Sequence, residues 1–258
     1  MCFVKTDFSK IEYPDILYKY RKFNDPYQDR FITNREVYLA SPSDFEDNLD
    51  CANLPRHDLL TKSQEFEYHY HLSKRSYPYL RDSDHKASAL IWCWKNLFKD
   101  PEKIKNFQTR WKEEYFKRRG VLSLTANSRN PEMWEKYGDE NKGYCIGYDS
   151  SILFKYMGGG GEVGYYDTLP IIYPVPLMER SRQLYLNDYA KEIKWKFEEE
   201  YRCVRFFNKV ANTIDRQIQL PREAFKTISI GVEMSEENRF KIKKMIYDSI
   251  GSIEIVEL

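Results

Sequence analysis

The sequence predicts an α+β fold, a single mixed domain over residues 1–258 with short, mainly antiparallel sheets flanked by helices. Short apolar and β-branched runs bounded by turn residues recur along the chain, as is typical of strands. One long segment instead repeats its apolar residues at helical spacing, and the C-terminal segment combines both patterns. No internal repeat, low-complexity tract or long linker separates the chain into domains.

Three strands are expected in the first half of the chain. Residues 16–20 and 36–40 are apolar and aromatic runs, and the second run ends at a Ser-Pro-Ser turn signal at residues 41–43. Residues 121–125 form a third short run with β-branched residues at its ends. These runs predict the strands of the first half.

A helix is expected between the second and third of these strands, over residues 101–119. Asp100 supplies a cap and Pro101 suits the first turn, while Gly120 is expected to stop the helix. Its apolar stripe comprises Ile104, Phe107, Trp111 and Tyr115. We expect this stripe to be buried and the charged residues to form a solvated outer face.

Four consecutive glycines at residues 158–161 predict a flexible loop. A phosphate cradle would need such glycines before a helix, usually with a nearby Lys and Ser or Thr. Here the glycines are followed by residues 162–166, which have the pattern of a strand and not of a helix. They contain no Lys with a Ser or Thr. The loop is therefore not expected to bind phosphate.

The C-terminal segment predicts a strand, a helix and a strand in succession. The strands are expected at residues 227–232 and 252–256, and the helix is expected to begin at Ser235 with acidic residues in its first turn. The apolar stripe of this helix comprises Phe240, Ile242, Met245 and Ile246. This order predicts a compact α/β unit.

The composition excludes several classes of protein. Lys and Arg number 41 against 40 Asp and Glu, so the net charge of +1 creates no overall basic field for nucleic acid or an anionic membrane. No run approaches 18 apolar residues, and residues 1–7 lack the layout of a signal peptide. The five cysteines lack C-x-x-C spacing, which argues against a disulfide framework or structural zinc. We expect a cytoplasmic protein without a membrane or nucleic-acid partner.

Residues 194–204 contain the most informative charged pattern. If they form a strand, one face carries Lys196, Glu198, Glu200 and Arg202. Carboxylates held this way can orient a hydroxyl and stabilise developing positive charge, and the neighbouring cation can hold a phosphate. If they form a helix, one solvated, salt-bridged face carries Lys191, Trp195, Glu198 and Arg202. Periodicity alone leaves both interpretations open.

Other polar clusters have simpler explanations. The acidic residues Asp44, Glu46, Asp47 and Asp50 lack the spacing of a calcium loop, so capping of local backbone amides is favoured over Mg²⁺ or Ca²⁺ binding. His69 and His71 alternate as on one strand face, but no third metal ligand is evident. We expect four of the cysteines to be small, buried hydrophobic residues, namely Cys51, Cys93, Cys145 and Cys203.

Two further patterns are also found in proteins that bind or cleave nucleic acid. The helix at residues 101–119 is basic, although its aromatic residues belong to the stripe that we expect to be buried. The Glu-x-Lys at residues 192–194 is found in metal-dependent nucleases, but an upstream acidic strand partner is missing. Neither pattern makes nucleic acid an expected partner.

Four ordered motifs resemble those of bacterial proteins grouped as domain-of-unknown-function family 2971. The first is an aromatic-Lys-aromatic strand at residues 17–20, and the second is an apolar strand, a Ser-Pro turn and an acidic motif at residues 37–50. The third comprises a Ser/Thr strand, M-W-x-x-Y and G-x-x-I-G within residues 123–149. The fourth, K-x-x-x-W-x-x-E-x-E-x-R, spans residues 191–202. The resemblance covers about residues 18–231.

The order of these motifs also resembles that of the ADP-ribosyltransferase fold. In that fold a polar residue of the first strand binds the nicotinamide ribose, a role that the resemblance assigns to Lys19 or Tyr20. A second-strand residue lies near the nicotinamide, here Ser41 or Ser123. A late glutamate, here Glu200, binds the ribose 2′-hydroxyl and favours an oxocarbenium-like transition state.

The same resemblance assigns supporting roles. Glu198 would orient the acceptor, and Arg202 would hold Glu198 or a phosphate. Asp139 would line or support the cleft together with Trp134 and Tyr137. The resemblance also favours a strand for the segment that contains the two glutamates.

Three functions follow from the sequence and the resemblance. The first is a NAD-using ADP-ribosyltransferase or glycohydrolase, with NAD as substrate and no metal, acting as an effector in phage defence or a toxin system. The alternative is a non-catalytic module that binds a small-molecule nucleotide or a protein from the same operon. The third is a metal-dependent nuclease. The chain departs from the family at Glu46 and Asn48, where Asn and Pro are usual.

Overall fold

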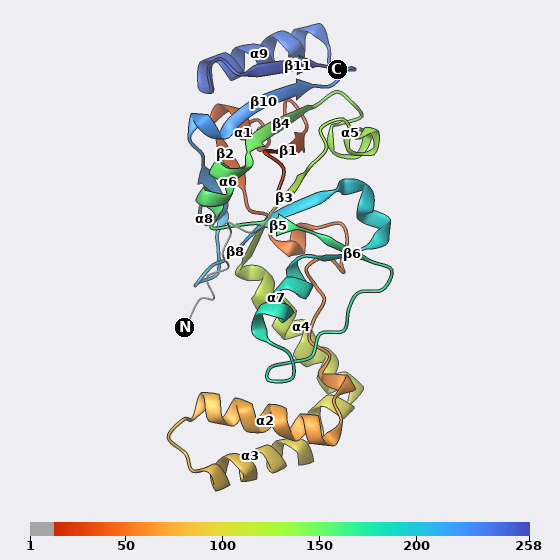
Figure 1. Cartoon of the computed structure of the whole chain (residues 1–258), viewed down its shortest axis with the longest axis vertical. Coiled ribbons are helices and arrows are strands. Elements are labelled where there is room, and N and C mark those ends of the chain that lie inside the picture. Colours follow the sequence, from red (N-terminus) through yellow and green to blue (C-terminus); the bar gives the residue numbers. More distant parts are fainter. Residues whose placement is uncertain (1–12) are drawn as a thin grey trace.

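The structure is a computed structural model that describes residues 13–258, and it confirms the predicted α+β class (Figure 1). Residues 1–12 lie outside the described part, and they include residues 1–7, for which the sequence predicts no signal peptide. Most strands belong to one seven-stranded sheet. In spatial order they are β11 (Glu254–Glu257), β10 (Phe225–Ile230), β4 (Tyr144–Asp149), β1 (Ile16–Arg21), β3 (Arg119–Thr125), β8 (Glu200–Phe206) and β5 (Gly161–Glu162).

The strands of this sheet are antiparallel, except that β10 and β11 are parallel. Two small two-stranded sheets complete the β structure. They pair β2 (Glu36–Tyr38) with β9 (Gln217–Gln219), and β6 (Gly164–Tyr166) with β7 (Ala190–Glu192). The strands expected at residues 16–20, 36–40, 121–125, 227–232 and 252–256 are present within a few residues of the predicted bounds. The strand expected at residues 162–166 is instead divided between β5 and β6, which belong to different sheets.

Six helices pack around the sheets. They are α1 (Arg30–Thr33), α5 (Pro131–Tyr137), α6 (Ser150–Met157), α7 (Arg180–Asp188), α8 (Thr213–Arg216) and α9 (Glu236–Ser249). The predicted cap of α9 is confirmed, because the Ser235 side chain accepts a hydrogen bond from the Asn238 amide. Within residues 13–258, no helix combines the length and apolarity needed to cross a bilayer.

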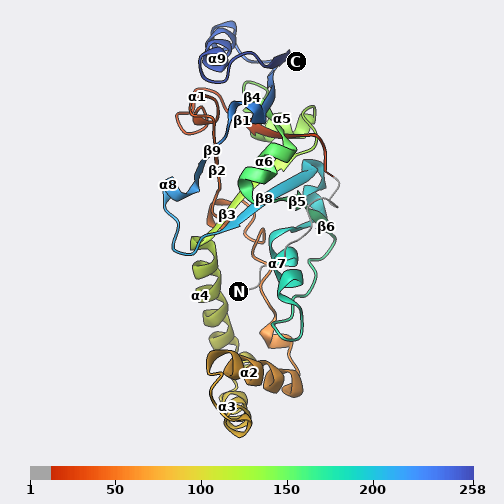
Figure 2. The same cartoon turned by 60° about the vertical axis from the view of Figure 1, so that its left-hand side comes forward.

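Three longer helices form an arm at one end of the molecule. They are α2 (Lys62–Ser76), α3 (Asp82–Trp94) and α4 (Pro101–Lys117). In both views α4 leads away from the sheet toward α2 and α3, which lie side by side (Figures 1 and 2). The predicted start of α4 is confirmed, since Asp100 accepts hydrogen bonds from the amides of Glu102 and Lys103.

The C-terminal half of α3 exposes mainly apolar side chains. Leu90, Ile91 and Trp94 are 61%, 55% and 85% exposed, whereas Phe98, just beyond the helix, is 2% exposed. We expect Trp94→Ser to change the free energy of unfolding by less than about 0.5 kcal/mol, because so little of the side chain is buried. Phe98→Ala is the matched control, with an expected loss of about 3–5 kcal/mol. Denaturant unfolding followed by circular dichroism would test this, and similar losses for both variants would contradict it.

Two hydrophobic clusters lie on opposite faces of the sheet. Side chains alternate between faces along a strand, so Leu17 of β1 enters the larger cluster while Tyr20 enters the smaller. The larger cluster is covered by α6 and α9, and the smaller by Met133 and Trp134 of α5. Trp134 is 3% exposed and packs edge-on against Tyr20, as expected for a core residue. The face covered by α5 also carries the candidate site.

Two expectations about single residues were wrong. Gly120 does not stop the helix, which ends at Lys117, but lies within β3. A Cβ atom at Gly120 would lie 2.8 Å from the Cβ of Leu39, so close strand packing accounts for the glycine. Phe240 does not belong to the buried stripe of α9, because it is 72% exposed, whereas Ile242 and Ile246 are buried.

The expected strand around His69 and His71 was also wrong, because both residues lie on α2. The capping box formed by Thr61 and Gln64 begins a helix there, and hydrogen bonds along that helix override the local alternation. His69 is stacked against Phe98 with ring centroids 5.3 Å apart, and burial lowers its pKa to about 4. This histidine is therefore a neutral core residue of the arm.

Candidate functional site

A cavity of about 390 Å³ opens on the face of the sheet that α5 covers. It lies where β1 and β3 separate, since these strands are in register only at Tyr18 and Thr125. The flanking pairs are longer, with six aligned positions between β1 and β4 and seven between β3 and β8. Five predicted site residues line the cavity, namely Lys19, Tyr20, Ser123, Glu198 and Glu200. The separation of two central strands thus creates the site.

The segment with the two glutamates is neither the regular strand nor the α-helix that periodicity allowed. Residues Ile193–Glu198 form a 3-10 helix, and β8 begins at Glu200. Glu199, between them, has a φ of 43°, in the left-handed region. The strand interpretation therefore holds from Glu200 onward. This turn brings Glu198 and Glu200 to the same cation.

Five buried charged side chains form an ion network at the base of the cavity. The ammonium of Lys191 lies 3.1 Å from a carboxylate oxygen of Glu200, 3.4 Å from one of Asp50, and also contacts Glu198. Arg202 donates to both oxygens of Glu200, over 2.7 and 2.8 Å, and pairs with Asp50 at 2.8 Å. Two cations thus compensate three carboxylates at buried positions.

The network holds the two glutamates in different electrostatic states. Burial alone would raise the pKa of Glu200, but Arg202 and Lys191 outweigh it and hold that pKa well below its usual value. Burial raises the pKa of Glu198; Lys191 opposes this rise, whereas the charge of Glu200 adds to it. Neighbouring carboxyl groups with pKa values shifted in opposite directions suit one group to remain ionised while the other exchanges a proton.

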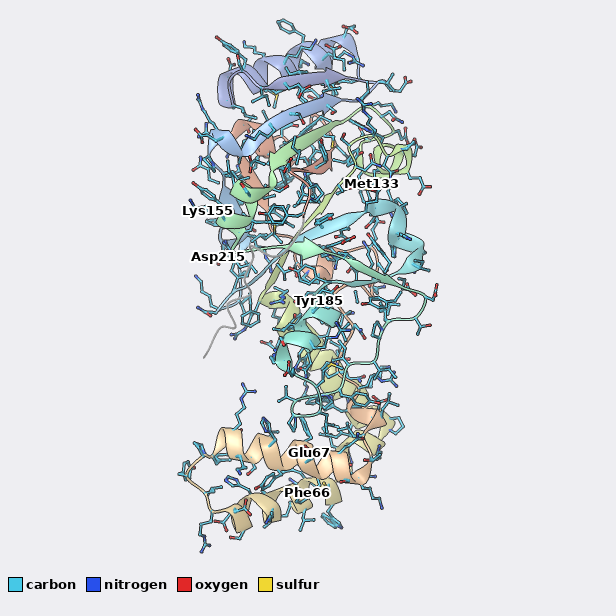
Figure 3. The ribbon with its side chains drawn as sticks, in the orientation of Figure 1. Phe66, Glu67, Met133, Lys155, Tyr185 and Asp215 are labelled. Atoms are coloured by element: carbon cyan, nitrogen blue, oxygen red, sulfur yellow. The ribbon has the colours of Figure 1, made fainter. Side chains whose placement is uncertain are left out.

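An aromatic wall faces this charged base. The indole of Trp195 donates to Asp47 over 2.7 Å, and the ammonium of Lys136 lies 4.2 Å from the Trp195 ring centroid. Tyr137 donates its hydroxyl to Glu198 over 2.7 Å. Met133 of α5 also lines the cavity, far from Phe66 and Glu67 in the helical arm (Figure 3). The cavity therefore combines ring surfaces with fixed charges.

The other predicted site residues occupy different places. Ser41 is buried away from the cavity, where its hydroxyl donates to the Phe116 carbonyl over 3.1 Å. Asp139 has a side chain that is 41% exposed and lies 3.7 Å from Lys22. Of the two candidates for the second-strand position, only Ser123 is on the cavity wall.

Two predicted residues are almost fully buried, Tyr20 in the cavity wall and Arg202 beneath it. Tyr20 is 3% exposed, and its hydroxyl donates to the Asn127 carbonyl over 2.9 Å. Arg202 is fully buried, and besides its carboxylate partners it donates to the Asp188 carbonyl over 2.7 Å. Arg202 therefore holds Glu200, rather than the predicted Glu198 or a phosphate.

The sequence interpretation missed the roles of Asp50 and Lys191. Asp50 was expected to cap local backbone, a role that Asp47 fulfils by accepting from the Leu49 amide. Asp50 instead pairs with Arg202, 152 residues away. Lys191 stood at the start of the fourth motif, which was the signal that pointed to it. Within residues 13–258, no group of three or more acidic, His or Cys side chains is arranged to hold a metal ion.

Lys19 has an unusual environment on the cavity wall. Burial, with a smaller effect from Arg21, lowers its pKa to about 7, although Glu200 and Glu198 act in the opposite direction. We expect competitive acetylation of Lys19, read by mass spectrometry, to show a midpoint near pH 7. Acetylation of Lys105, which is exposed on α4, is the control for the reactivity of the reagent. A Lys19 midpoint near the ordinary lysine value of about 10.4 would contradict this environment.

The lowered pKa of Lys19 also sets the sign of a stability effect. From about pH 7 to the unfolded value near 10.4, the unfolded chain binds a proton at Lys19 that the folded chain lacks. The contribution of Lys19 to the free energy of unfolding therefore increases with pH across this window. We therefore expect the free energy of unfolding of the wild type to rise relative to that of Lys19→Met as the pH rises. A difference that is flat between pH 7 and 9 would contradict this expectation.

Comparison of the chain with protein-family models, with curated proteins and with solved structures gave no significant match. The expectations that the motifs raise therefore depend on the residues themselves.

Proposed function

We propose that the protein binds NAD⁺ in this cavity and cleaves its nicotinamide–ribose bond, as a glycohydrolase or an ADP-ribosyltransferase. The observation that carries the proposal is that Lys19, Ser123 and Glu200, from β1, β3 and β8, line one cavity. These are residues that the resemblance assigned to the nicotinamide ribose, the nicotinamide and the ribose 2′-hydroxyl. A solvent-facing Glu200 would have opposed the assignment, but its side chain is 3% exposed.

The electrostatics of the two glutamates supports this chemistry. As the bond between ribose C1′ and the pyridinium nitrogen breaks, its electron pair goes to the nitrogen and positive charge develops on the ribose. An ionised Glu200 stabilises that charge best in a site that excludes water. Water or an acceptor hydroxyl then bonds to C1′ and loses a proton, which Glu198 can accept in its ionised form because its pKa is raised.

One observation favours a second function, a non-catalytic binding module. Both carboxylate oxygens of Glu200 already accept from Arg202, and Lys191 contacts one of them, so the side chain is satisfied without a ligand. The cavity could then hold a nucleotide between its aromatic wall and its cations without turnover. A metal-dependent nuclease has less support, because the Lys191 ammonium occupies the point where Asp50, Glu198 and Glu200 converge.

The experiment is incubation of the purified protein with NAD⁺, with nicotinamide release followed by chromatography. Release that depends on Glu200 would support the enzyme. If the folded protein releases no nicotinamide, isothermal titration with NAD⁺ decides the second function, since binding without turnover would support the module. Neither release nor binding would overturn both functions.

A further inference from the structure

We propose that a groove along α4 binds single-stranded nucleic acid. This groove, of about 760 Å³, is separate from the cavity described above, and Phe107, Trp111 and Tyr115 line it. The sequence predicted that these aromatic residues would be buried, but Phe107 and Trp111 are only partly buried. Their rings therefore contribute to a surface that a ligand can reach.

The groove follows one face of α4. Its lining residues on the helix recur every three or four positions from Lys103 to Arg118, which corresponds to about 22 Å at 1.5 Å per residue. Arg180 at the start of α7 and Phe206 at the end of β8 line it as well. The groove is therefore elongated, which suits an extended chain better than a compact small molecule.

The charge on the lining is strongly positive although the whole chain carries only +1. Four cations line the groove, namely Lys103, Arg110, Arg118 and Arg180, of which Lys103 also pairs with Asp100 at 3.2 Å. The acidic residue among the lining residues, Glu114, is paired with Lys117 at 2.9 Å. Within the described chain, Arg110 makes no side-chain hydrogen bond or ion pair. This charge favours a polyanion, because cationic side chains that neutralise phosphates release the counterions condensed on a nucleic acid.

The aromatic residues favour a nucleic acid over an acidic peptide. The Trp111 ring is stacked nearly parallel on Tyr115, with centroids 4.8 Å apart and an angle of 13° between the planes. Tyr115 is only 6% exposed and thus holds the partly exposed Trp111 ring in place. Accessible aromatic rings are platforms on which any unpaired base can stack. Alternation of rings and guanidinium groups along one groove matches a strand in which bases alternate with phosphates. An acidic peptide would use the cations but not the rings.

Fluorescence anisotropy with a labelled oligothymidylate of about 12 nucleotides tests the proposal. Each neutralised phosphate contributes about −0.7 to the slope of log K against log salt, so four cations give a slope of up to about −2.8. We expect Arg110→Gln to weaken binding severalfold and reduce the magnitude of that slope by about 0.7. Trp111→Ala should weaken binding at least fivefold.

Lys105→Gln is the matched control, because Lys105 is exposed on α4 and is not among the residues that line the groove. Arg110 is also exposed, so its substitution tests the groove even if Trp111→Ala fails to fold. The proposal is overturned if the wild type does not bind the oligonucleotide, or if Lys105→Gln weakens binding as much as Arg110→Gln. It is equally overturned if a polyglutamate peptide competes as well as unlabelled oligothymidylate.

Discussion

Arg202→Met should lower the free energy of unfolding by about 3–5 kcal/mol, which is a large part of the stability of a typical domain. The guanidinium is fully buried and pairs with Glu200 and Asp50, and it also donates to the Asp188 carbonyl. Methionine fills similar volume but leaves these carboxylates with Lys191 as their remaining partner in the network. Denaturant unfolding followed by circular dichroism measures the loss.

Two further variants show whether the loss comes from the buried charge. Arg205→Met changes the next arginine of β8, which is only partly buried and donates to the Tyr156 carbonyl, so we expect a loss below about 1 kcal/mol. Arg202→Lys keeps the charge but cannot form the bidentate pair, so its loss should be intermediate. An equal loss for Arg205→Met and Arg202→Met would contradict the role of the network.

Glu200→Gln should reduce nicotinamide release from NAD⁺ roughly 100- to 1,000-fold if the proposed activity is correct. Glutamine keeps the size of the side chain but removes the negative charge that would stabilise the transition state. Glu199→Gln is the matched control, because Glu199 is exposed and accepts from Asn127, and its rate should stay near that of the wild type. A rate for Glu200→Gln within threefold of the wild type would contradict the proposal.

Loss of charge at Glu200 also disturbs the ion network, so folding must be measured alongside the rate. The variant should retain the circular dichroism of the wild type at the assay temperature, and its affinity for NAD⁺ is measured by isothermal titration. Ser123→Ala provides an independent test, because it changes the cavity wall without removing a charge. We expect a slower rate from this variant with little change in unfolding; an unchanged rate would remove Ser123 from the site.

Much of the fold could be predicted from the sequence because it depends on local interactions. The caps at Asp100 and Ser235 begin their helices through hydrogen bonds to amides two or three residues away. Short runs of apolar residues likewise predicted the positions of strands, because side chains alternate between the two faces of a sheet. The alternation around His69 misled because a helix and a short strand can share such a pattern over five residues.

The site could be predicted only in part. The motifs indicated Ser123, Glu198 and Glu200, which line one cavity, and also Ser41, which lies elsewhere. Neither helical nor strand periodicity described the glutamate segment, since the left-handed Glu199 separates a 3-10 helix from β8. Attraction of both neighbouring glutamates to Lys191, together with their burial, accounts for this geometry better than local propensity does.

The sequence by itself determined the class of fold, most strands of the main sheet, the two capped helices α4 and α9, and the residue types available for the site. Only the tertiary structure decided which charges meet. Asp50 and Arg202 are 152 residues apart, and their pairing depends on the packing of a loop against β8. Capping and periodicity act over a few residues of the chain, whereas ion pairs and cavities depend on which distant segments the sheet brings together.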